Sequence, residues 1–174
     1  MFGIFLSKNE RQIKVHADLV LKKIAVAADA VSKNDLTYLN AEEYTKDKDF
    51  QKNFAYGLRL VASYYIVKIV SEHMPEKDAN IFGIQMNKFA NSNNLYSSKA
   101  MALLIYEIQI PTRIVGLFDA SSEWLWSRIF ENKNPTKIQI MALSELLEAL
   151  HPQVVKVLEG VTNLSFRNST IPKI

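Results

Sequence analysis

The chain has 174 residues, 48% of them hydrophobic and 22% charged, which suits one domain that buries about 70% of its unfolded surface. It contains no cysteine, which excludes disulfides, thiolate zinc sites and cysteine nucleophiles. The net charge of +3 is spread along the chain among acidic residues, and this dispersed pattern disfavours nucleic-acid binding, which needs a concentrated basic patch.

The beginning of the sequence lacks the basic stretch of a secretory signal peptide. The longest uncharged apolar runs, 60–67 and 100–106, are much shorter than the roughly 18 to 20 residues that span a bilayer. We therefore expect a soluble, cytoplasmic protein that does not enter membranes. The abundance of Lys, Ile and Asn is typical of an A/T-rich bacterial or phage genome.

The first predicted element is a helix over residues 9–32. Ser7 followed by Glu10 resembles a capping box at its start. Its apolar positions alternate at spacings of four and three, which is the core-facing stripe of a bundle helix. The stripe consists of Ile13, Ala17, Val20, Ile24, Ala27 and Val31.

The opposite side of this helix is also partly apolar. Val15, Leu19 and Val26 project away from the stripe, beside Lys22. Either a second layer of the fold covers these side chains or they meet a partner.

Residues 34–49 are polar and are expected to form a solvated connection. The segment 50–74 is apolar on nearly every side, which indicates a central helix ended by Pro75. Gly57 inside this helix costs about 1 kcal/mol relative to Ala, which is tolerable where a neighbouring helix approaches closely.

A shorter helix is predicted over 78–90, before the polar loop 91–94. Ser97 or Ser98 can cap a helix over 99–110, with buried residues 100–105 and an end at Pro111.

The segments 106–110 and 137–140 alternate like strands, so a minor two-stranded pairing is an alternative to helix there.

Between residues 112 and 130, Asp119 or Ser121 is the expected helix cap. Trp124 and Trp126 stand about 200° apart on a helix and cannot both face one core. We expect one of them at a surface contact or in a pocket wall.

Two further helices are predicted, over 136–150 and 152–161, with Pro135 and Pro152 at their starts. Residues 1–6 and 163–174 are expected to be peripheral tails of a single domain, 1–174. The predicted fold class is all-α, an irregular bundle of six or seven helices.

Catalytic and metal motifs are scarce. No nucleotide-binding, zinc-protease or serine-hydrolase motif occurs, and His16, His73 and His151 are interpreted as structural. Glu148 and His151 form one Glu-x-x-His pair, whereas carboxylate-bridged iron sites in helical bundles use two such pairs. The sequence predicts no cofactor and no enzyme activity.

The leading hypothesis is a non-enzymatic protein that binds another protein, as inhibitors, immunity proteins and adaptors do, with a homodimer as one form. Its interface candidates are Val15, Leu19, Val26, Trp124 and Trp126, because exposed apolar clusters mark interfaces. The alternative is a ligand or metal site in the bundle near Glu148 and His151. A third hypothesis is nucleic-acid binding through Lys8, Arg11, Lys14, Lys22 and Lys23.

Overall fold

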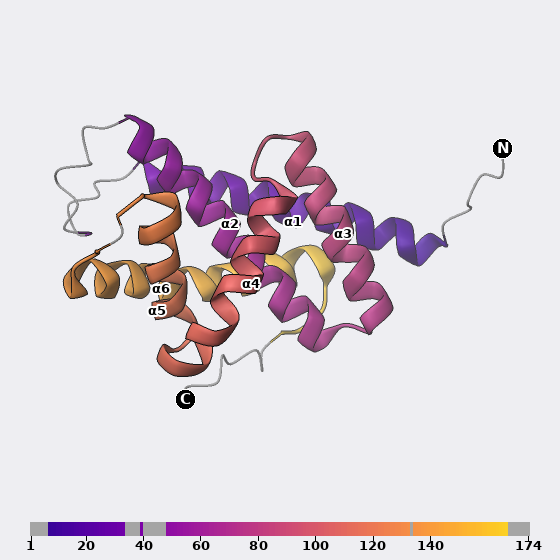
Figure 1. Cartoon of the computed structure of the whole chain (residues 1–174). Coiled ribbons are helices and arrows are strands. Elements are labelled where there is room, and N and C mark those ends of the chain that lie inside the picture. The colour runs from indigo at the N-terminus through magenta and orange to yellow at the C-terminus, as the bar shows by residue number, and fades with distance from the viewer. Residues whose placement is uncertain (1–6, 34–38, 40–47, 133, 167–174) are drawn as a thin grey trace.

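The computed structural model describes residues 7–33, 39, 48–132 and 134–166. They form six α-helices and one π-helical turn (Figure 1), which confirms the predicted all-α bundle. In chain order these are α1 (Lys8–Ser32), α2 (Lys48–His73), α3 (Glu76–Ser92), α4 (Ser98–Val115), α5 (Leu117–Trp124), the π-helical turn η2 (Leu125–Ile129) and α6 (Lys137–Thr162). Since 106–110 lies within α4 and 137–140 within α6, the strand-pair alternative is wrong.

Side-chain caps fix the starts of three helices. The capping box of Ser7 and Glu10 is present at α1, and Ser97 caps α4 by accepting from the backbone N–H of Ala100. A second capping box, formed by Thr136 and Gln139, starts α6. Each cap satisfies backbone N–H groups that have no partner within the helix.

Helix α2 is central, as predicted, and packs against α1, α3, α4, η2 and α6. A Cβ atom added to Gly57 would lie 2.7 Å from Leu125 Cδ2 and 3.3 Å from Ile129 Cγ2. The close approach expected at this glycine is therefore made by η2.

Two prolines predicted at helix boundaries, Pro111 at an end and Pro152 at a start, lie inside helices. Helix α4 continues past Pro111 to Val115, and α6 continues past Pro152 to Thr162. The buried side chains of Val154 and Leu158 extend the core-facing line of the first half of α6, so packing compensates for the backbone hydrogen bond that the proline removes.

The break between α4 and α5 occurs at Gly116, whose φ of 89° lies in the left-handed region that favours glycine. The prediction of Asp119 or Ser121 as the cap of this helix is wrong. Asp119 accepts a hydrogen bond from Ser144 Oγ on α6, and Ser121 Oγ donates to the Leu117 carbonyl one turn back.

One segment predicted to be a solvated connection and one predicted to be a peripheral tail contribute to the core. Leu39, in the connection before α2, is fully buried. After α6 ends at Thr162, Phe166 is buried with its ring against His73, and its backbone N–H donates to Glu159 Oε1 at 2.9 Å. The predicted tail is therefore wrong at Phe166, whereas 1–6 and 167–174 lie outside the described residues.

Candidate protein-binding surface

The outer face of α1 carries the three apolar residues predicted there. Val15, Leu19 and Val26 are 55%, 44% and 65% exposed. The spacings of four and seven residues place them on one line along the helix, opposite the buried residues that face α2, α3 and α6. No second layer of the described structure covers this line.

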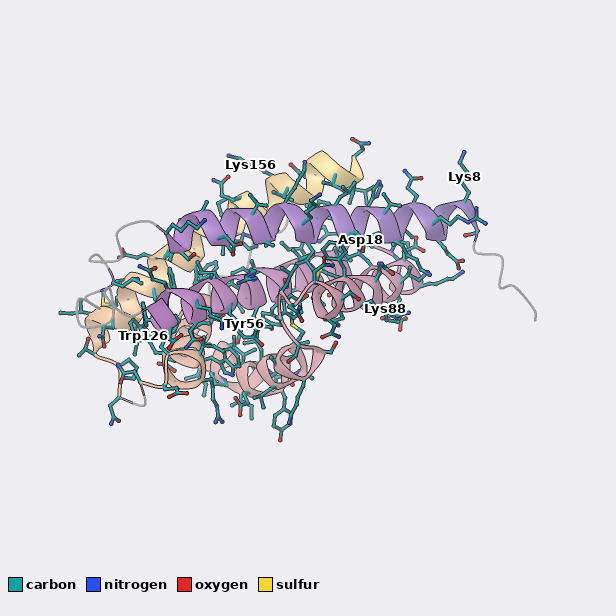
Figure 2. The ribbon with its side chains drawn as sticks, turned by 90° about the horizontal axis from the view of Figure 1, so that it is seen from above. Lys8, Asp18, Tyr56, Lys88, Trp126 and Lys156 are labelled. Carbon is teal, nitrogen blue, oxygen red and sulfur yellow. The ribbon has the colours of Figure 1, made fainter. Side chains whose placement is uncertain are left out.

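The acidic side chains of α1 are all engaged with neighbouring helices. Glu10 forms an ion pair of 2.9 Å with Lys77, and the hydrogen bond from Lys77 lowers the pKa of this carboxyl group. Asp18, on the edge of α1 beside α3 in Figure 2, accepts a hydrogen bond of 2.8 Å from Gln85. Asp29 lies 3.5 Å from the Arg59 guanidinium. These contacts draw the negative charge of α1 toward the body of the protein.

The cations of α1 point outward instead. Lys8, at the exposed start of the helix in Figure 2, is accompanied by Arg11, Lys22 and Lys23, all exposed, whereas Lys14 is half-buried. On a helix with about 3.6 residues per turn, Arg11 and Lys22 lie on one side of the apolar line and Lys23 on the other. The face therefore has an apolar centre between positive margins.

Trp126 does not belong to any surface, because its side chain is fully buried and its indole N–H donates to the Gln139 carbonyl on α6. Trp124 is 7% exposed, and its indole N–H donates to Glu107 Oε2 on α4 at 2.9 Å. The two rings do point to different neighbours, as the helical geometry requires. Both α4 and α6 pack against this segment, so neither ring makes the expected surface contact, but Trp124 lines the wall of a groove, which was the other expectation.

A second apolar face, on α4, was not predicted. Four side chains at spacings of three, four and four are between 42% and 79% exposed: Leu103, Tyr106, Ile110 and Ile114. The residues 100–105, expected to be buried, include the exposed Ala102 and Leu103. The helix is apolar around most of its circumference, so the sequence pattern does not show which side faces the core.

Beside this face lies a groove of about 860 Å³ between α4, the α5–η2 segment and the start of α6. Tyr106 and Ile110 form its α4 side, and Trp124 lines it from α5. Glu107 braces the groove, because the carboxylate accepts from Trp124 and from both Nε and a terminal nitrogen of Arg128. Such a bidentate arrangement fixes geometry as well as charge.

The two residues of the metal half-motif have different surroundings. Glu148 is exposed, while the His151 ring packs against Tyr65 and Phe118 at centroid distances of 6.0 and 6.1 Å. Burial among these rings lowers the pKa of His151. Within the described ranges, no three His, Cys, Asp or Glu side chains are arranged to hold a metal ion.

The other two histidines line the same hollow, which the sequence did not reveal. His16 and His73 both line a smaller hollow of about 270 Å³, where the end of α2 and the start of α3 meet α1. His73 Nδ1 lies 2.9 Å from the Ile69 carbonyl oxygen of its own last turn, consistent with its predicted structural role at the helix end.

No known protein family, curated protein or solved structure is significantly similar to this chain. Any function must therefore be argued from the surfaces themselves. Among the helices described, none combines the length and the apolar character needed to cross a membrane.

Proposed function

We propose that the protein acts by binding another protein through the outer face of α1, without catalysing a reaction. The observation that supports this most directly is the exposed line of Val15, Leu19 and Val26, opposite the core. Protein interfaces combine an apolar centre with a polar margin, and aliphatic side chains on such a line gain free energy when a partner removes them from water.

The charge of the face specifies the partner's chemistry. Glu10 and Asp18 are engaged with α3, whereas Lys22 and Lys23 are free to point outward. The partner therefore carries carboxylates around an apolar patch, because opposite charges steer encounter and exclude wrong partners. Inhibitor, immunity and adaptor proteins act in this way, and we place this protein among them, in the bacterial cytoplasm.

Nucleic-acid binding is the competing interpretation of the same cations. A phosphate backbone offers no apolar surface to Leu19, which lies between Lys22 and Lys23 on the helix, so the mixed face favours a protein partner. Binding to duplex DNA would weaken steeply between about 50 and about 200 mM salt, with a slope set by the number of phosphate contacts.

The test compares three baits in an extract of the organism that encodes the chain: wild type, Leu19→Asp, and Ile84→Asp as a matched change at an exposed aliphatic residue of α3. The protein retained by wild type and by Ile84→Asp, but lost by Leu19→Asp, is then purified and titrated. We expect Leu19→Asp to raise its Kd at least about 30-fold. Equal retention by all three baits overturns the proposal, as does tight DNA binding that Leu19→Asp leaves unchanged.

A further inference from the structure

The outer face of α4 is distinguished from that of α1 by its shape. Tyr106 is 79% exposed and projects beside a groove whose α4 side it shares with Ile110, which is 71% exposed. A protruding ring and a hollow therefore lie next to each other on one surface. Aromatic side chains that fill a partner's pocket are typical centres of binding energy.

The apolar line of α4 is close to symmetric about its midpoint. The spacings of three, four and four between Leu103, Tyr106, Ile110 and Ile114 run in nearly the same order from either end. Two copies of α4 packed antiparallel would set Tyr106 against Ile110 of the second copy, and Leu103 against Ile114. An interface with twofold symmetry requires this kind of self-complementary surface.

Charge favours the same orientation. The exposed cations of this face, Lys99 and Arg113, lie near opposite ends of the line, and its acid, Glu107, is already held by Arg128. Parallel packing would set each cation beside its own counterpart. Antiparallel packing separates the two Arg113 positions by about 14 Å along the axis, at 1.5 Å per residue, and offsets Lys99 of one copy from Arg113 of the other by about 7 Å. The cations are therefore farther apart than in parallel packing.

We propose that two copies of the chain associate through antiparallel α4 helices, with the Tyr106 ring of each copy in the α4–α5 groove of the other. The Glu107–Arg128 pair holds the groove open for this ring. The α1 face takes no part, because α1 and α4 lie on opposite sides of α2 in Figure 2, so both surfaces can be occupied together.

Sedimentation velocity of the full chain over a range of concentrations tests the association. We expect a reversible dimer, and Ile110→Asp should raise its dissociation constant at least about 30-fold. Because Ile110 is exposed, the variant should retain the wild-type melting temperature when both chains are measured at a concentration at which the wild type is monomeric. Leu19→Asp on α1 is the control that should still dimerise. A chain that is monomeric at every concentration, or a dimer that survives Ile110→Asp, overturns the proposal.

Cysteine cross-linking tests the orientation, since the chain has no cysteine of its own. Leu103→Cys and Ile114→Cys leave the central Tyr106 and Ile110 intact. In the antiparallel dimer a disulfide should form when the two variants are mixed and oxidised, and neither variant should cross-link with itself. Cross-linking of Leu103→Cys with itself indicates parallel helices and contradicts the proposed arrangement.

Discussion

The outer faces of α1 and α4 both expose apolar side chains, but they differ in charge and in surface shape. On α1 a line of three aliphatic residues runs between cations. On α4 a longer line borders a groove and includes a protruding tyrosine. A face with cations beside its apolar line is suited to a partner of opposite charge, whereas a face with its own protruding ring and groove is suited to a copy of itself. Apolar exposure alone does not distinguish these two uses.

The largest expected effect is a difference in stability between a substitution in the core and a substitution on an exposed face. The sequence grouped Trp126 with Val26 as surface candidates, but Trp126 packs against Phe50 and Phe130 in the core. Trp126→Ala should lower the free energy of unfolding by about 3 to 5 kcal/mol, while Val26→Ala should change it by no more than about 0.5 kcal/mol. Urea denaturation of both variants checks this difference, and similar midpoints would contradict the buried position of Trp126.

The next effect tests the independence of the two faces. Lys22→Glu combined with Lys23→Glu should slow association with the α1 partner by roughly tenfold or more at low salt, because steering depends on these charges. The α4 dimer should keep its dissociation constant. Stopped-flow mixing and sedimentation measure the two quantities, and a weakened dimer would show that the surfaces are coupled.

Much of the α1 face could be predicted because its core stripe is regular, so the remaining apolar residues had to face outward. The α4 face could not be predicted from the sequence, because Leu103 and Leu104 are equally apolar neighbours and only the packing decides that Leu104 is buried. The interior prolines misled for a related reason. Pro152 signals a boundary between two helices locally, but Val154 and Leu158 continue the packing of one helix beyond it.

Helix and cap positions were recovered where the signal is local, as at Ser7 with Glu10 and at Ser97. The groove and the Glu107 brace depend on residues about 20 positions apart that meet through tertiary structure. A single sequence carries no local signal for such a meeting, nor for the burial of Phe166.

A smaller effect concerns the close approach of η2 to α2 at Gly57. Gly57→Ala should destabilise the fold by about 1 kcal/mol or more, because the new methyl group would meet Leu125, which is fully buried. Gly83→Ala on α3 has open space and should instead stabilise by about 0.5 to 1 kcal/mol. Melting temperatures that shift in the same direction would contradict this contrast.

The smallest expected effect is a dependence of stability on pH. Burial lowers the pKa of His151 below its ordinary 6.5 in the folded protein, so the unfolded chain binds a proton more readily. The stability that depends on the neutral His151 ring is fully present above about pH 6.5 and is lost as the pH falls through the folded pKa. Urea midpoints between about pH 7.5 and 5 should fall less for His151→Phe than for wild type. An equal fall of the urea midpoint in both proteins would show that the pKa of this ring is the same in the folded and unfolded chain.

The single residue Gly116 between α4 and α5 has a consequence for the energetics of any encounter at the groove. Only Gly116 separates α4 from α5, and Glu107 on α4 accepts hydrogen bonds from Trp124 on α5 and Arg128 on η2. Few backbone torsions therefore remain to change the angle between the two helices. The cavity therefore exists before an occupant arrives. A ring that enters it meets a preorganised receptor and loses little free energy to rearrangement, which lets a small contact area give measurable affinity.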